Sequence, residues 1–123
     1  MRIGLLLLTQ SGAYIDEDGN LPDRPLWDKQ FLMDITEGMR CKASHNTYNS
    51  LPERLKRTCD VIPGFRRNDK TKKYDINLGI DGLEEVDLLI ITRSHYIGEG
   101  KVFRLDKFRM ILKIEELEIW KRV

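Results

Sequence analysis

The sequence predicts a single α/β domain over residues 1–123, with a mixed, mostly parallel central sheet, few flanking helices and a C-terminal β-hairpin. Two apolar runs, Ile3–Thr9 and Val86–Thr92, have the length and composition of strands buried on both faces. The stretch Leu26–Thr36 places apolar residues on one helical face, and Gly38 follows where a C-terminal cap is expected. A chain of 123 residues fits one domain of this class.

The overall charge excludes several kinds of partner. Twenty-one Lys and Arg balance 20 Asp and Glu, which leaves a net charge of +1. Such a balance gives no general attraction to nucleic acid or to acidic membranes, so we expect neither as a partner. The first apolar run is too short for a membrane span and lacks a signal-peptide cleavage site.

The cysteines and histidines are few and scattered. Cys41 and Cys59 form no CxxC pair and no disulfide-dense pattern, which predicts free thiols in a reducing compartment. We therefore expect a cytoplasmic protein with no metal site.

Turn-forming residues and short apolar runs divide the rest of the chain. The segment 10–25 is rich in Gly, Asp and Pro and predicts a loop. Ser44 or Asn46 is expected to cap a brief helix that ends near Pro52. A strand is expected at 59–62, and the pattern over 39–43 alternates only weakly.

Two segments allow two interpretations each. The basic stretch 66–75 fits either a solvated hairpin tip or a phosphate-binding loop. Residues 108–119 alternate as two strands hinged near Glu115 and Glu116, although their composition also suits one amphipathic helix. Gly98, Glu99 and Gly100 mark a turn between these segments and the strand before them.

Several motifs occur together in the order of a known family. The first is Ile15-Asp16-Glu17-Asp18-Gly19-Asn20-Leu21-Pro22, followed by an acidic residue, Asp28, on the predicted helix. The second is Thr47-Tyr48-Asn49-Ser50-Leu51-Pro52, and the third is the strand that ends Ile91-Thr92-Arg93. In these features the chain resembles dihydrofolate reductase and the related reductase domain of riboflavin biosynthesis.

The resemblance implies roles for named residues. Asp28 matches the acid that orients a pterin ring and supports its protonation, and Thr92 matches the threonine behind that acid. Leu21, Phe31 and Leu32 match the apolar walls of the ligand site, and Arg54 or Arg57 matches an arginine that holds an anionic tail. Ser44, His45 and Thr47 fall where the family contacts NADPH.

The chain departs from the family on the cofactor side. Ser44-His45-Asn46 replaces the Gly-Arg step whose arginine grips the cofactor's phosphates. The family's adjacent glycines are not recognisable, since Ile80 and Asp81 separate Gly79 from Gly82. Few residues remain before the next strand for the helix whose N-terminus receives the diphosphate.

These departures lead to three hypotheses. The first is a non-catalytic or weakly catalytic protein that binds a nucleotide- or pterin-type molecule beside Asp28, as a sequestering or sensing protein does. The second is a minimal NADPH-dependent reductase of dihydrofolate or a related pterin or pyrimidine. The third is an interaction protein or homodimer that uses an open sheet edge. Ile119 and Trp120 are candidate residues for that surface, although ordinary core or sheet packing is the commoner use of such residues.

Overall fold

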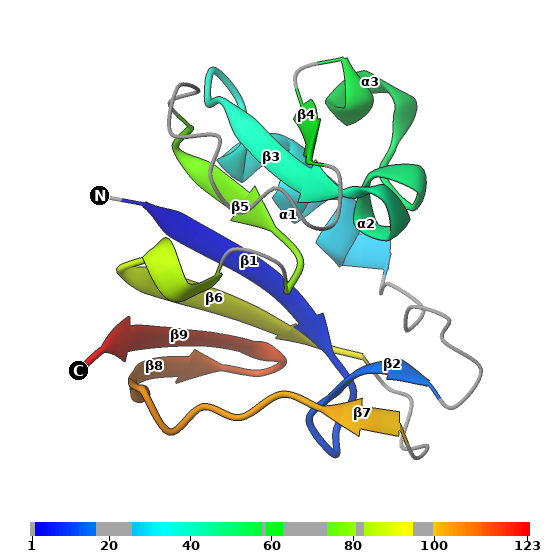
Figure 1. Ribbon diagram of the computed structural model, residues 1–123. Coiled ribbons are helices and arrows are strands. Elements are labelled where there is room, and N and C mark those ends of the chain that lie inside the picture. Colours follow the sequence, from blue (N-terminus) through cyan, green and yellow to red (C-terminus); the bar gives the residue numbers. More distant parts are fainter. Residues whose placement is uncertain (1, 17–25, 58, 63–73, 81–82, 95–99) are drawn as a thin grey trace.

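A computed structural model describes residues 2–16, 26–57, 59–62, 74–80, 83–94 and 100–123 (Figure 1). Their main feature is a seven-stranded sheet in the order β4-β3-β5-β1-β6-β9-β8. The first five strands in that order are parallel, and β9 and β8 are antiparallel to their neighbours. A separate two-stranded ribbon joins β2 to β7.

The elements have the following bounds. The large sheet contains β1 (Ile3–Leu8), β3 (Cys41–Ser44), β4 (Cys59–Ile62), β5 (Ile76–Leu78), β6 (Leu88–Arg93), β8 (Phe108–Ile114) and β9 (Leu117–Arg122). The ribbon contains β2 (Ala13–Asp16) and β7 (Gly100–Val102). The helical elements are α1 (Leu26–Ile35), α2 (His45–Asn49), α3 (Glu53–Lys56) and the 3-10 turn η1 (Leu83–Glu85).

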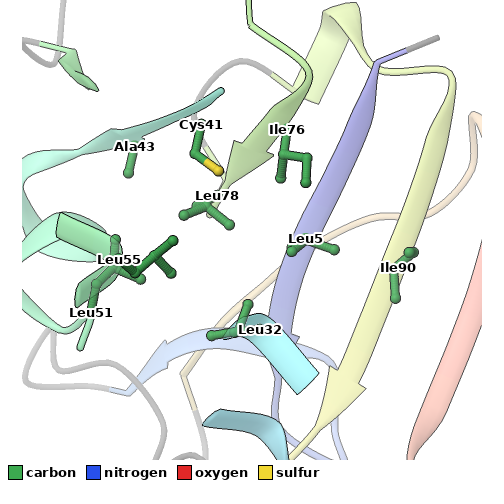
Figure 2. Close-up of a cluster of buried hydrophobic side chains, with 9 residues drawn as sticks. All are labelled: Leu5, Leu32, Cys41, Ala43, Leu51, Leu55, Ile76, Leu78 and Ile90. Carbon is green, nitrogen blue, oxygen red and sulfur yellow. The ribbon is translucent and has the colours of Figure 1, made fainter. Parts of the chain in front are cut away.

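The central strand β1 divides the core into two clusters. Leu5 faces the side of the sheet that α1 covers, whereas Leu6 and Leu8 face the opposite side. Figure 2 shows the first cluster, in which Leu32 of α1 lies among side chains from the sheet and from the α2–α3 segment. Because β1 is covered on both faces, apolar side chains are favoured at successive positions, which explains its continuous apolar run.

Most of the predicted elements are confirmed. The strands over 3–9, 59–62 and 86–92 are present as β1, β4 and β6, and the helix over 26–36 is α1. The brief helix after Ser44 is α2, with Ser44 at its N-cap. The C-terminal segment is a hairpin, so the helical alternative is wrong; Glu115 takes a positive φ of 52° at its turn.

Other parts differ from the predictions. The predicted loop at 10–25 is wrong over Ala13–Asp16, which is a strand because it pairs with β7, far along the chain. Residues 17–25, most of the basic stretch 66–75 and the turn residues Gly98 and Glu99 lie outside the described residues. Ile119 and Trp120 are half-buried and pack against opposite core clusters, which is the ordinary core packing expected of such residues and not a role at an exposed surface. In the described part, no helix has both the length and the apolar character needed to cross a membrane.

Candidate functional site

The predicted site residues of β3 and β6 lie where parallel strands end. Ser44 is the last residue of β3, Thr92 is the penultimate residue of β6, and Gly79 directly follows β5. Because β1, β3, β5 and β6 are parallel, their carboxyl ends lie at the same edge of the sheet. In open α/β sheets this edge is where small ligands bind.

Thr47 and Gly79 pack directly against each other at this edge. Gly79 has a φ of +89°, and a Cβ built on it would collide with Oγ1 of Thr47. The Thr47 side chain is buried. Only glycine fits this position without strain, because the turn needs a positive φ and the threonine fills the space beside it.

Hydrogen bonds hold the Gly79 backbone in place. Its N–H donates to the carbonyl oxygen of Leu5 at 2.9 Å. Its carbonyl oxygen accepts from Nδ2 of Asn77 at 3.1 Å. The turn after β5 is thus tied to the central strand β1 and to its own strand.

Two serine side chains contact Thr47, whereas His45 points to solvent. The hydroxyl of Ser44 lies 3.5 Å from the hydroxyl of Thr47, and Ser50 donates to the Thr47 carbonyl oxygen at 2.7 Å. His45 is the first residue of α2 and is exposed. The structure therefore groups Ser44, Thr47 and Gly79, which are two predicted cofactor-side residues and one glycine.

Thr92 lies on the face of the sheet that α1 covers. It is buried and pairs with Leu7 of β1. It falls two residues after Ile90, whose side chain packs in the cluster with Leu32. Since side chains alternate along a strand, Thr92 points to the same face as Ile90.

The α1 residues of the predicted site are only partly described. Asp28 belongs to α1, but its side chain lies outside the described part, as does the whole of Leu21. Leu32 is 3% exposed and is a core residue, while Phe31 is half-buried and packs against the same cluster. Thr92 and α1 thus share one face, as the resemblance implies.

Arg54 and Arg57 lie apart from Thr92. Arg54 is in α3 and Arg57 is its C-cap, and both are exposed. The helix packs beside β4, and β3, β5 and β1 separate β4 from β6 in the sheet. The structure therefore brings these arginines to the α2 side of the site, not to the Thr92 side.

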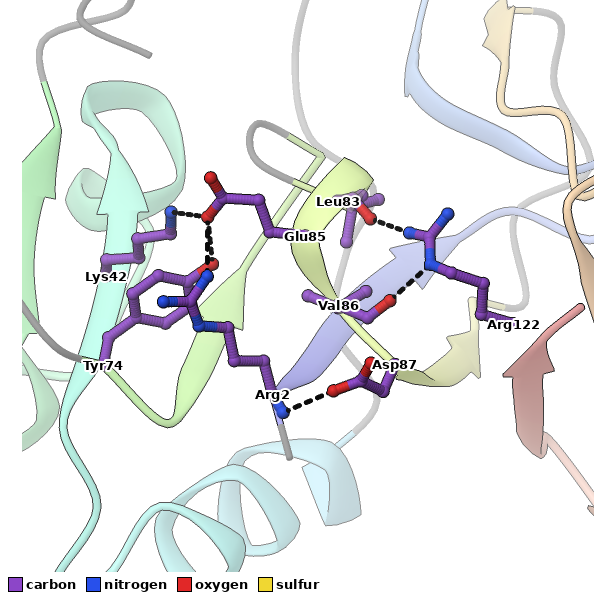
Figure 3. A network of polar contacts seen from close by, with 8 residues as sticks. All are labelled: Arg2, Lys42, Tyr74, Leu83, Glu85, Val86, Asp87 and Arg122. Atoms are coloured by element: carbon purple, nitrogen blue, oxygen red, sulfur yellow. Dashed lines mark hydrogen bonds and ion pairs between the residues drawn. The ribbon is translucent and has the colours of Figure 1, made fainter. Parts of the chain in front are cut away.

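A polar network fixes the connection between β5 and β6 (Figure 3). Glu85 of η1 accepts hydrogen bonds from Tyr74 Oη at 2.9 Å and Arg2 Nη1 at 3.2 Å, and lies 3.6 Å from Lys42 Nζ. The hydrogen bond from Tyr74 is the main reason why the pKa of Glu85 is below its usual value. Burial, and then the same hydrogen bond, raise the pKa of Tyr74.

The other end of this connection is held by an arginine of β9. Arg122 donates from Nε to the carbonyl oxygen of Val86 at 2.7 Å, and from Nη2 to that of Leu83 at 2.5 Å. The backbone N–H of Arg2 donates to the carboxylate of Asp87 at 3.0 Å. Arg2, Lys42 and Arg122 thus use their charged groups in contacts within the protein.

Asn77 is a buried polar residue beside the Gly79 turn that sequence reasoning missed. Its side chain is fully buried in β5, and its Oδ1 has no hydrogen-bond partner within the described structure. A single asparagine between Ile76 and Leu78 was the available signal, because a polar residue in a short buried strand normally has a specific partner.

Comparison with protein-family models and with curated proteins gave no match to this chain. Among the described residues, no group of three or more His, Cys, Asp or Glu is arranged to hold a metal ion.

Proposed function

We propose that the chain is a dihydrofolate-reductase-like protein that binds a nucleotide- or pterin-type small molecule where its parallel strands end, beside α1, with weak or no catalysis. The observation that carries the proposal is the contact between Thr47 and Gly79. It joins the segments that follow two adjacent parallel strands, β3 and β5, at the edge where this class of sheet binds ligands.

The turn at Gly79 is suited to close approach of a ligand to the backbone. A glycine that has no room for a Cβ, held by hydrogen bonds to Leu5 and Asn77, keeps a rigid backbone surface beside the Thr47 hydroxyl. Rigid polar groups at the end of a sheet orient small ligands with little loss of conformational entropy. The resemblance adds Asp28 of α1 as the acceptor for a ring edge, with Thr92 on the same face of the sheet.

The short connection between β5 and β6 argues against tight binding of NADPH, and therefore in favour of weak or absent catalysis. Nine residues, 79–87, join Leu78 to Leu88, and the described ones include the single turn η1. Such a connection offers no long helix whose N-terminus could receive a diphosphate.

The alternative is an active minimal reductase that uses NADPH. It is favoured by Thr47, which the resemblance implies contacts the cofactor and which lies directly against the backbone of Gly79. In that case Asp28 would orient the substrate, Ser44, His45 and Thr47 would contact NADPH, and NADPH would supply the hydride.

The deciding experiment measures the melting temperature of the full chain with dihydrofolate, methotrexate, nucleotides, NADP or NADPH. A ligand at about a hundred times its Kd stabilises the native state by about 2.7 kcal/mol, which gives a clear rise in melting temperature. We expect a rise with a pterin or nucleotide and no NADPH oxidation. No rise with any of these compounds contradicts the proposal, whereas turnover of NADPH establishes the alternative.

Two variants of α1 sharpen this experiment. Asp28→Asn is expected to abolish the rise caused by pterins, because it removes the charge that accepts hydrogen bonds from the ring. Asp34→Asn is the matched control, since Asp34 is an exposed acid of the same helix. Equal responses of both variants would show that Asp28 does not hold the ligand.

A further inference from the structure

The two cysteines of the chain lie side by side in the sheet. Cys41 is the first residue of β3 and Cys59 is the first residue of β4, and the two are register partners in this parallel pair. Such partners have Cα atoms roughly 4.8 Å apart and side chains on the same face of the sheet. Both side chains pack in the same core cluster, and Figure 2 shows Cys41 within it.

This placement meets the geometric requirement for a disulfide, whose Cα atoms lie about 4.4–6.8 Å apart. Both thiols are free. Cys41 Sγ lies 3.9 Å from the carbonyl oxygen of Met39, and Cys59 Sγ lies 3.8 Å from that of Asp60. A thiol is a weak donor, so these contacts do not hold the sulfur atoms apart. Burial, and then the charge of Cys41, raise the pKa of Cys59, as is expected of two thiols that lie close together.

We propose that Cys41 and Cys59 form a reversible disulfide when the protein meets a low-molecular-weight disulfide such as oxidised glutathione. The Cys59 thiolate attacks one sulfur of the oxidant and releases the first glutathione thiolate. The Cys41 thiolate then attacks the Cys59 sulfur of this mixed disulfide and releases the second. The protein loses two protons and two electrons, and the oxidant becomes two thiols. This inference does not depend on the proposed ligand site.

The position of β4 explains how an oxidant reaches these thiols. Cys41 is fully buried and Cys59 is half-buried, so both are protected while β4 is in place. β4 is a terminal strand of the sheet and pairs with β3 on one side, so it opens more easily than a central strand. A glutathione group attached to Cys59 does not fit inside a packed core. The return of β4 to the sheet therefore favours displacement of glutathione by Cys41.

The disulfide is expected to act on the segment between its two ends. It closes a loop over residues 41–59, which contains α2 and α3. Closing a loop restricts the unfolded chain and thereby stabilises the folded one. A Cα separation shorter than the usual distance of about 5.5–6 Å makes a disulfide easier to reduce. Oxidation therefore fixes β4 and the α2–α3 segment against β3, and reduction releases them.

The first test incubates the full chain with oxidised glutathione for several hours at about pH 8, where thiolate forms slowly in the native state. We expect the intact mass to fall by the mass of two hydrogen atoms, and dithiothreitol to reverse this change. The melting temperature of the oxidised protein should rise by about 5 °C or more. An unchanged mass, glutathione adducts on both cysteines, or dimers linked by disulfides overturn the proposal.

Cys59→Ser is the matched control for this test, because it keeps only the buried Cys41. It is expected to show no loss of two hydrogen atoms and no rise in melting temperature after the same treatment. An equal mass loss in this variant would place the oxidation at another residue and would overturn the assignment.

The second test needs no variant and separates the effect of the fold from simple closeness in the sequence. The ratio of intramolecular disulfide to mixed disulfide, at a fixed glutathione concentration, measures the effective concentration of the two thiols. We expect this ratio to be at least about tenfold higher in the folded protein than in the urea-denatured protein, because strand pairing holds the cysteines together. Equal ratios in the two states would show that the fold does not bring the thiols together.

Discussion

Arg93 of β6 and Glu118 of β9 form a bidentate ion pair between adjacent strands of the sheet. The Nε and Nη2 atoms of Arg93 each donate to one carboxylate oxygen of Glu118, both at 3.1 Å. Trp120 donates to the same carboxylate at 3.0 Å, and Arg93 Nη1 donates to the carbonyl oxygen of Thr9 at 3.2 Å. The pair thus joins the C-terminal hairpin to the end of the central strand.

Removing Arg93 is expected to be strongly destabilising. Arg93→Met leaves the buried Glu118 carboxylate without its charge partner, and such losses cost about 3–5 kcal/mol. The measurement is urea unfolding at neutral pH. Arg104→Met, at an exposed arginine, is the control and should change stability by about 0.5 kcal/mol or less.

Replacing both partners tests the cause. Arg93→Met combined with Glu118→Met is expected to be more stable than Arg93→Met alone, because no buried charge is left unpaired. If the double variant is no more stable, the loss comes from packing of the arginine side chain and not from the unpaired charge of Glu118.

The same ion pair predicts a dependence of stability on acid. Burial would raise the pKa of Glu118, but hydrogen bonds from Arg93 and Trp120 and the Arg93 charge outweigh it and hold the pKa below 4.5. A lowered pKa gives stability above the unfolded pKa, and this stability is lost as pH falls through the folded value. We expect the wild type to lose more stability than Glu118→Gln between about pH 5 and about pH 3. Parallel losses in both proteins would contradict this assignment.

The predictable parts of the fold are those with strong local patterns. The run of leucines in β1 and the helical spacing of α1 each indicate an element without reference to distant residues. The alternation over β8 and β9 favours two strands, although their composition also suited a helix. The elements β2 and β7 were not predictable in this way. Each is short, and each exists because it pairs with a segment far away in the sequence.

The elements that carry the candidate site residues were predictable, but the contacts between them were not. Thr92 lies near the end of β6, a strand that the sequence predicts, and Thr47 lies within α2, the brief helix expected after Ser44. The contact of Thr47 with Gly79 was not foreseen, because it depends on β5 lying between β1 and β3. The polar Asn77 interrupts that strand, so its apolar pattern is too short to recognise.

The two cysteines are expected to react slowly in the folded protein. Burial, with a smaller effect from Asp75, raises the pKa of Cys41 to about 11. Burial also raises the pKa of Cys59 to about 12, helped by Cys41 and Asp60. Since the thiolate is the reactive form, iodoacetamide at about pH 8 should modify the native protein much more slowly than the denatured protein. Cys59→Ser reports Cys41 alone, and equal rates in both states would contradict the prediction.

The raised thiol pKa values also predict a loss of stability in alkali. A group whose folded pKa is raised stabilises the native state below its unfolded pKa, which is 9.0 here, and loses this effect as pH rises toward 11 and 12. Stability should therefore fall above about pH 9, and fall less in the double variant Cys41→Ala/Cys59→Ala. If stability falls equally with pH in the wild type and in the double variant, the loss comes from other titrating groups.

Gly79 is constrained in two ways, by its positive φ and by the Thr47 side chain beside it. Gly38 also has a positive φ, +73°, but a Cβ there would meet nothing within 4 Å. Gly38→Ala should therefore cost only the backbone strain, about 1–2 kcal/mol. Gly79→Ala should cost about 1–3 kcal/mol more, because its Cβ also collides with Thr47. Urea unfolding of the two variants measures this difference.

A double-mutant cycle then identifies Thr47 as the source of the collision. Thr47→Ala in the Gly79→Ala background should recover the steric part of the loss, leaving a cost close to that of Gly38→Ala. The same change in the wild type should be destabilising, because it empties a filled position beside the turn. Additive effects of the two changes would mean that Thr47 and Gly79 do not contact one another, and would remove the observation on which the ligand site depends.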